Sequence, residues 1–158
     1  MNARILIADD HEVVREGLKF LLANARPEWS ICGEAITGEQ TIECARDLKP
    51  DIVLLDVTMP GMSGLKASSQ MRKLGLDCRI LIFTTHEFET LGTEVRKAGA
   101  QGYVLKSQAF HDLVVAIEAV LGGGTFFGRP QPREEQAEKG PSLGIVFFRS
   151  NLRQAESS

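Results

Sequence analysis

Four short runs of consecutive apolar residues and one mixed segment, residues 29–35, recur along the chain, and each is followed by a stretch with apolar residues at every third or fourth position. The runs are too short for helices and rich in branched aliphatic side chains, so they predict strands that are buried on both faces. The predicted strands cover residues 4–8, 29–35, 52–55, 79–84 and 103–105, and the predicted helices cover residues 11–22, 38–48, 63–74, 87–98 and 110–121. Strands that alternate with amphipathic helices predict an α/β protein with a parallel sheet covered on both faces.

Two of the predicted helices carry distinctive features. Asp10 stands where the N-cap of the first helix is expected, since a short polar side chain there can accept a free backbone N–H group. The fourth helix, residues 87–98, has only Leu91 and Val95 as an apolar stripe, so we expect it to be the least firmly packed.

The character of the chain changes after the glycine triplet at residues 122–124. We expect residues 1–124 to form one domain and residues 125–158 to form a linker and short tail. The first part of the tail is rich in proline, glutamate and lysine, which is typical of a polar linker. Within the tail, residues 143–148 are an isolated β-prone run. No complete DNA-binding domain fits in this space, because a helix-turn-helix reader needs several helices of about 10 residues each.

The composition is that of an ordinary globular protein, with 43% hydrophobic and 25% charged residues and a net charge of −3. A negative chain offers no general attraction to nucleic acid. No apolar run approaches the roughly 20 residues needed to span a bilayer, and the N-terminus lacks a signal-peptide pattern, so we expect a cytoplasmic protein without membrane contact. The odd number of cysteines, which are Cys32, Cys44 and Cys78, favours reduced thiols.

Candidate chemistry lies at the carboxyl ends of the predicted strands. These positions are occupied by Asp9 and Asp10, by Asp56, by Thr84 and by Lys106. Because parallel strands end at the same edge of a sheet, and ligands of open α/β sheets bind there, we expect these side chains to converge.

A cluster of Asp9, Asp10 and Asp56 requires a cation or raised pKa values. Carboxylates about 5 Å apart repel by roughly 3 kcal/mol per pair at an effective dielectric near 20. Oxygen ligands at an edge open to solvent favour Mg²⁺ over zinc. With Mg²⁺, Lys106 and the Thr84 hydroxyl could surround a phosphoryl group on Asp56. A plain ion pair of Lys106 with one acid is also compatible with this geometry, but it would not explain the three acids.

Residues 4–121 resemble a response-regulator receiver domain, the phosphoacceptor module of bacterial two-component signalling. The motifs that carry the resemblance are Asp9-Asp10 after the first strand, Leu54-Leu55-Asp56-Val57-Thr58-Met59-Pro60 with Gly64 following, Thr84 after the fourth strand, and Gly102-Tyr103-Val104-Leu105-Lys106. The segment from Lys97 to Ser107, with Ala116-Ile117 and Gly122-Gly123 downstream, resembles the NarL/FixJ (LuxR-type) subgroup in particular. The resemblance implies a flavodoxin-like (βα)5 doubly wound sheet with strand order 2-1-3-4-5.

The resemblance also implies roles for single residues. Asp56 would accept a phosphoryl group from a sensor histidine kinase, and Asp10, Asp56 and the backbone carbonyl of Thr58 would bind Mg²⁺, with Asp9 aiding through water. Lys106 would contact the phosphoryl group. The pair Thr84 and Tyr103 would then switch the surface around the fourth helix, the fifth strand and the fifth helix, with homodimerisation on phosphorylation as one outcome. Such a domain phosphorylates and dephosphorylates itself and is otherwise not an enzyme.

Two positions depart from the family pattern. Thr85 stands where the family usually has alanine, serine or glycine, so we expect narrower access to Asp56. Ser107 stands where many receivers have a proline with a cis peptide bond. Because a cis bond without proline costs several kcal/mol, we expect a trans bond or a strained loop at Ser107.

Other functions fit the sequence less well. A phosphatase with an aspartate nucleophile would use Asp-x-Asp-x-Thr, but Thr58 stands where its general acid would be. A flavin-binding protein of similar winding would need a phosphate loop after the first strand, where Asp9 and Asp10 would repel phosphate. His11 and His86 lie on the same edge and could bind metal, although as loop residues they are more typical of solvated side chains. The chain could be a stand-alone receiver or the receiver of a DNA-binding regulator without its helix-turn-helix, so we expect no DNA binding from this chain alone.

Overall fold

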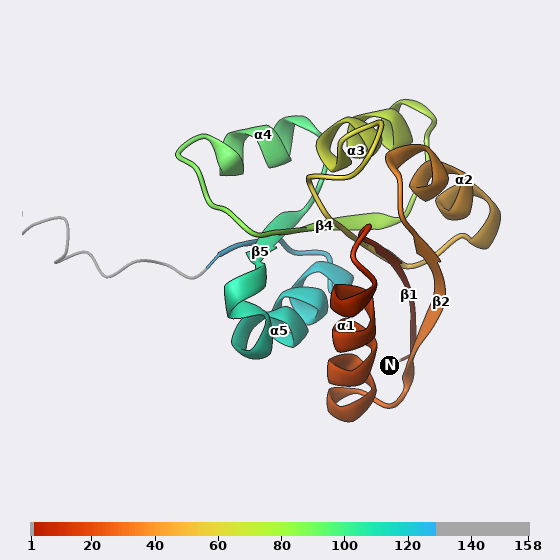
Figure 1. Ribbon diagram of the computed structural model, residues 1–158, viewed down its shortest axis with the longest axis vertical. Helices are drawn as coiled ribbons and strands as arrows, with labels where there is room; N and C mark the ends of the chain where they lie inside the picture. The colour runs from red at the N-terminus through yellow and green to blue at the C-terminus, as the bar shows by residue number, and fades with distance from the viewer. Residues whose placement is uncertain (1, 129–158) are drawn as a thin grey trace, which may run out of the picture. The chain divides into compact units, whose positions relative to one another are not determined.

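The computed structural model describes residues 2–128, which form a parallel sheet with helices on both faces (Figure 1). The strands are β1 (Ala3–Ala8), β2 (Trp29–Ala35), β3 (Ile52–Leu55), β4 (Arg79–Thr84), β5 (Gly102–Leu105) and β6 (Phe126–Phe127), in the sheet order β2-β1-β3-β4-β5-β6. The helices are α1 (Glu12–Ala25), α2 (Gly38–Leu48), α3 (Gly64–Lys73), α4 (Leu91–Lys97) and α5 (Ala109–Leu121), with a 3-10 turn at Lys106–Gln108 before α5. Every pair of neighbouring strands is parallel.

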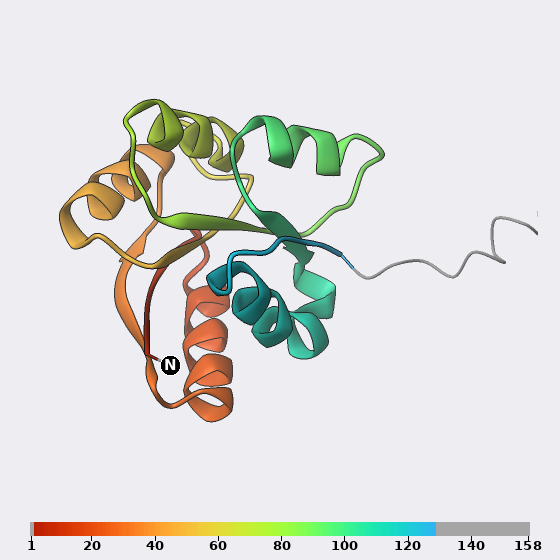
Figure 2. The same ribbon diagram turned by 180° about the vertical axis from the view of Figure 1, so that it is seen from behind.

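The sheet separates two hydrophobic cores. Helices α1 and α5 cover one face, and α2, α3 and α4 cover the other, as the two opposite views show (Figures 1 and 2). Along β1, Ile5 and Ile7 point into the first core and Leu6 and Ala8 into the second. Alternation of this kind explains the unbroken apolar runs in the sequence, because side chains on both faces of a central strand are buried.

The predicted α/β class and the strand order 2-1-3-4-5 are confirmed, and the sheet carries a sixth strand that the sequence pattern did not indicate. Strand β6 lies within the residues expected to be linker, and the compact unit runs to Gly128. The predicted β-prone run at residues 143–148 and the rest of the expected tail lie outside the described residues.

Two local predictions were wrong. The N-cap of α1 is His11 and not Asp10, because Oδ1 of Asp9 accepts the His11 backbone N–H at 2.9 Å and leaves the Asp10 side chain on the acidic cluster. Helix α4 begins at Leu91 and not near Glu87, so it has only 7 residues. Its apolar stripe is as thin as predicted, although Leu91 and Val95 are fully buried.

Candidate functional site

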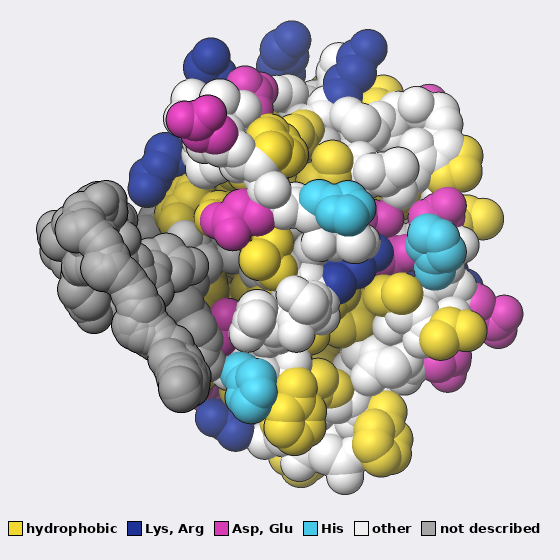
Figure 3. All heavy atoms as spheres, turned by 60° about the vertical axis from the view of Figure 1, so that its left-hand side comes forward, with side chains coloured by type: hydrophobic (Ala, Val, Ile, Leu, Met, Phe, Trp, Pro, Cys, Tyr) yellow, Lys and Arg dark blue, Asp and Glu magenta, His cyan; other side chains and the backbone are white. Residues whose placement is uncertain are grey.

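The strand ends bring the predicted acids together at one edge of the sheet. Ligand atoms of Asp9, Asp10, Asp56 and His11 all lie within 4.8 Å of one another. Nζ of Lys106 lies 2.7 Å from Oδ2 of Asp9 and 3.4 Å from Oδ1 of Asp56. On the face in Figure 3, basic and acidic side chains lie recessed between histidine side chains. The convergence predicted from the parallel strands is therefore present.

Backbone contacts fix the acids in place. The backbone N–H of Asp56 donates to the carbonyl of Ala8 at 2.9 Å, which ties the end of β3 to the end of β1. On α1, the Arg15 guanidinium donates to the Asp9 carbonyl at 2.9 Å and to Glu34 on β2 at 2.7 Å. The carboxylates are therefore held by three neighbouring strands and one helix, and little rearrangement is needed to use them.

Asp56 is a buried acid whose charge is disfavoured by its surroundings. Only 4% of the residue is exposed. Burial, and next the nearby carboxylate of Asp9, raise the pKa of Asp56, while the Lys106 ammonium and the Thr58 backbone N–H act in the opposite direction. Because Lys106 pairs with both acids, it partly offsets their mutual repulsion. It therefore lowers the free-energy cost of ionising Asp56.

The turn after Asp56 depends on Gly64, the first residue of α3. Its backbone N–H donates to the carbonyl of Val57 at 2.8 Å, and a Cβ atom at this position would overlap the carbonyl oxygen of Asp56. Ser63 caps the helix by accepting the Lys66 N–H at 3.2 Å. A glycine is therefore required here because α3 begins directly against the backbone of the acidic residue.

Replacement of Gly64 by alanine should lower the free energy of unfolding by about 3 kcal/mol, since the clash is with backbone atoms that cannot move away cheaply. The matched control is Gly17→Ala on α1, where a new Cβ meets nothing within 4 Å. This control should stabilise the chain by up to about 1 kcal/mol, because alanine favours a helix interior. Chemical denaturation of both variants checks the prediction, and equal stabilities would contradict it.

Thr84 and Tyr103 lie on neighbouring strands, β4 and β5. Thr84 is buried, and its hydroxyl donates to the carbonyl of His86 at a long 3.5 Å. The Tyr103 hydroxyl donates to Glu87 at 2.8 Å. Burial and this hydrogen bond raise the pKa of Tyr103 to about 12. Tyr103 therefore stays a neutral donor, attached to the loop that links Thr84 to α4.

Thr58 and Thr85 lie in loops and Ser107 in the 3-10 turn before α5, all at the same edge and all exposed. The peptide bond before Ser107 is trans, because the described residues contain no cis bond. The sequence predicts either a trans bond or a strained loop here, and the trans bond is the one observed. The expected narrowing of access to Asp56 by Thr85 stays a prediction.

His11 takes a more specific position than the sequence indicated. Its side chain is 66% exposed, as expected for a loop residue, but its Nδ1 lies 3.2 Å from Oδ1 of Asp9 and 3.2 Å from Oδ1 of Asp10. Adjacency to the acidic pair was the available signal in the sequence.

The acidic cluster has the donors that a hard divalent cation requires. Oδ1 of Asp10 is buried and receives no hydrogen bond, because Nδ1 of His11 is near it but outside hydrogen-bonding geometry. A buried carboxylate oxygen without a donor is costly unless a cation balances it. With carboxylates of Asp9, Asp10 and Asp56 facing one another, the residues present fit Mg²⁺.

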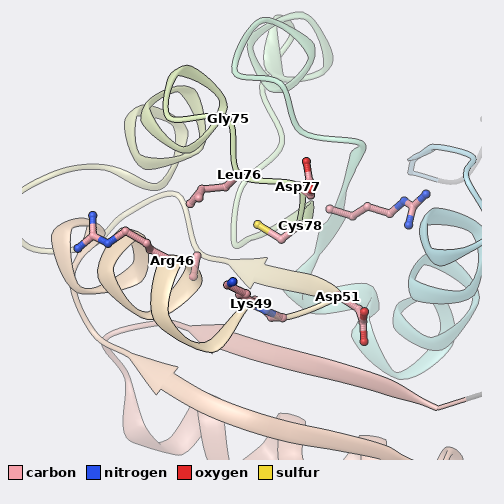
Figure 4. Close-up of a pocket in the computed structure, with 10 residues that line it drawn as sticks. Arg46, Lys49, Asp51, Gly75, Leu76, Asp77 and Cys78 are labelled. Carbon is pink, nitrogen blue, oxygen red and sulfur yellow. The ribbon is translucent and has the colours of Figure 1, made fainter.

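A separate cavity of about 470 Å³ lies at the amino ends of β3 and β4, away from the acidic cluster (Figure 4). Its walls carry both basic and acidic side chains, among them Arg46, Lys49, Asp51 and Asp77. Asp51 accepts the backbone N–H of Arg4 at 2.7 Å, so part of this charge joins β1 to β3. Mixed charges engaged in structural contacts do not favour a ligand site here.

Comparison with known protein families identifies the family of this domain. Residues 5–118 match the response regulator receiver domain. The chain belongs to this family. Among its receiver relatives, NarL of Escherichia coli, a nitrate/nitrite response regulator protein, is 41% identical over 77% of this chain and 56% of its own length. The response regulator GacA of Pseudomonas aeruginosa is 35% identical over 86% of this chain and 63% of its own.

Solved receiver structures agree with this assignment. A two-component response regulator of the LuxR family from an Aurantimonas species has a TM-score of 0.77 and 39% identity, and the match covers 88% of this chain and 98% of that one. The receiver domain of the putative response regulator NarL from Mycobacterium tuberculosis has a TM-score of 0.73 and 30% identity, with 77% and 98% covered. The predicted NarL/FixJ subgroup is confirmed. The chain spans about half to two thirds of the length of the curated relatives it matches. None of the helices described in this receiver is long and apolar enough to cross a membrane.

Proposed function

We propose that this receiver accepts a phosphoryl group on Asp56 from a sensor histidine kinase, in a reaction that depends on Mg²⁺. The observation that carries the proposal is the buried Asp56, set among two further acids and beside the Lys106 ammonium at 3.4 Å. An isolated structural ion pair would not need three carboxylates at one point. Acids that repel one another are retained where a cation and a transferred phosphoryl group will balance them.

In the transfer, a carboxylate oxygen of Asp56 forms a bond to phosphorus as the bond between phosphorus and the donor's nitrogen or oxygen breaks. A nitrogen leaving group takes a proton from water, an acetate leaving group departs as the anion, and no redox change occurs. Lys106 would follow the developing negative charge, since its amine already lies within 3.4 Å of Asp56. The Thr84 hydroxyl, whose bond to the His86 carbonyl is long, would turn to donate to a phosphoryl oxygen.

Asp10, Asp56 and the Thr58 carbonyl would hold Mg²⁺, with Asp9 aiding through water. When bound, the ion supplies positive charge that offsets the charge on the phosphoryl oxygens. A dedicated phosphatase is the weaker candidate, because Thr58 occupies the place of its general acid. We therefore propose a signalling domain in the cytoplasm that phosphorylates and dephosphorylates itself but is not otherwise an enzyme.

The test is incubation of the chain with phosphoramidate or acetyl phosphate and Mg²⁺, followed by intact-mass spectrometry. We expect one phosphoryl group per chain. As an acyl phosphate, this group should survive only briefly in mild acid and should be lost on treatment with hydroxylamine. Absence of any mass increase at saturating donor and Mg²⁺ would overturn the proposal.

Replacement of Thr84 by alanine should leave Asp56 able to accept phosphate but should uncouple the surface around α4 and β5. The reason is that the hydroxyl is the group in β4 that can follow the phosphoryl oxygens and so move the loop carrying Glu87. Amide hydrogen exchange with and without beryllofluoride measures this response. We expect changes across residues 84–106 in the parent chain and a large reduction of these changes in Thr84→Ala. Equal responses in the two proteins would contradict the role of Thr84.

A further inference from the structure

The segment that leaves α5 returns to the sheet and covers the edge of β5. Strand β6 pairs in parallel with β5, with Phe126 opposite Gly102 and Phe127 opposite Tyr103. The Phe126 backbone N–H donates to the carbonyl of Gln101 at 3.1 Å. A Cβ atom at Gly102 would overlap the carbonyl oxygen of Phe126, so β5 is built to receive this strand.

The Phe127 side chain is held by α4 on one side and by Tyr103 on the other. The guanidinium carbon of Arg96 lies 3.8 Å from the centre of the Phe127 ring. The rings of Tyr103 and Phe127 meet edge to face, with 6.0 Å between centres and 81° between planes. Contacts of both kinds are favourable. Only two residues of β6 pair with β5, and the Phe127 ring makes two contacts. A change in the position of the Tyr103 ring is therefore enough to break this attachment.

Tyr103 connects these contacts to the predicted phosphorylation site. Tyr103 is only 7% exposed, and both the Phe127 ring and Glu87, in the loop before α4, contact its side chain. Its hydroxyl is bonded to Glu87, which lies three residues after Thr84. A Cβ atom at Gly128 would lie 3.3 Å from the same hydroxyl, so the chain runs closely past the ring before it leaves the described fold. Tyr103 cannot turn away without leaving Phe127 without its edge contact.

We propose that residues 126–128 form a strap over the face made by α4 and β5, and that phosphorylation of Asp56 releases this strap by moving Tyr103 away from Phe127. The inference rests on the proposed phosphorylation of Asp56 and adds the route by which it reaches the C-terminal end of the receiver. In the unphosphorylated chain the strap occupies the face, so the edge of β5 is not free for a partner. Release exposes that edge and frees the chain at Gly128.

Linkage makes the proposal measurable in both directions. If a phosphoryl group favours the released state, then loosening the strap must raise the affinity of Asp56 for a phosphoryl mimic, by at most the ratio of the affinities of the released and closed states. Phe127→Ala removes both ring contacts, and Arg96→Gln removes the contact with α4 alone. Phe20→Ala is the matched control, since Phe20 is a phenylalanine on α1 that is 74% exposed.

The experiment uses beryllofluoride with Mg²⁺ on the full chain labelled with 3-fluorotyrosine. The chain has a single tyrosine, so the fluorine resonance reports Tyr103 alone. We expect beryllofluoride to shift this resonance and to speed exchange of the Phe126 amide about tenfold or more. Phe127→Ala should bind beryllofluoride about fivefold or more tightly than the parent chain. Arg96→Gln should change in the same direction, and Phe20→Ala should match the parent.

The outcomes separate this inference from the proposed function. If beryllofluoride changes amides next to Asp56 but leaves Phe126 exchange and the affinity of Phe127→Ala unchanged, the strap is overturned and phosphorylation of Asp56 stands. If no amide anywhere responds to beryllofluoride, the phosphoacceptor function fails and the strap fails with it.

Discussion

Asp56→Asn should abolish incorporation of a phosphoryl group from small-molecule donors, while the fold is kept. Asparagine has nearly the same shape as aspartate but lacks the nucleophilic carboxylate. The substitution also removes a buried negative charge, so the unliganded variant should be at least as stable as the parent near pH 7. This direction follows because burial and Asp9 raise the pKa of Asp56, which means that the folded chain disfavours its charged form.

The matched control is Asp47→Asn on α2, whose side chain is 67% exposed and lies away from the acidic cluster. It should be labelled to the same extent as the parent chain. Intact-mass spectrometry and a thermal melt on the three proteins provide the two readings. Full labelling of Asp56→Asn would show that another residue is the acceptor, and unfolding of the variant at room temperature would contradict the stability argument.

The sequence carried most of the site because the topology of parallel strands is so restrictive. Once β1, β3 and β5 were identified as parallel, Asp9, Asp56 and Lys106 were expected at the same edge, and the long Lys106 side chain then reaches to 2.7 Å from Asp9 and 3.4 Å from Asp56. The predicted role of Gly64 as part of a motif likewise has a direct steric reason in the overlap with Asp56. The order of strands and helices along the chain already determines where the backbone places these residues.

Strand β6 shows where this reasoning stops. Two residues have no period to detect, and Phe126 and Phe127 are a strand only because the exposed edge of β5 and the guanidinium of Arg96 accept them. The N-cap of α1 was missed for a different reason: Asp9 accepts the His11 N–H, and this local turn delays the start of the helix by one residue, so that His11 and not Asp10 is the N-cap. At β6 a tertiary contact decides the outcome, whereas at α1 one local hydrogen bond replaces another.

Mg²⁺ should stabilise the folded chain, and Asp10→Asn should remove most of that effect. An ion that binds only the folded site adds about 2.7 kcal/mol to the free energy of unfolding when its free concentration is 100 times its Kd. The effect is expected because Oδ1 of Asp10 is buried without a hydrogen-bond donor and the carboxylates of Asp9 and Asp56 lie beside it.

In the absence of Mg²⁺, Asp10→Asn should not be less stable than the parent chain. Asp10→Asn removes one of three mutually repelling charges, so its melting temperature in EDTA should equal or exceed that of the parent chain. The control Asp47→Asn should respond to Mg²⁺ like the parent, since Asp47 is not among the clustered acids. Differential scanning fluorimetry across an Mg²⁺ titration measures all three proteins. An identical Mg²⁺ response in Asp10→Asn and the parent would mean that the ion binds elsewhere, because a site built on these carboxylates cannot lose one of them without losing affinity.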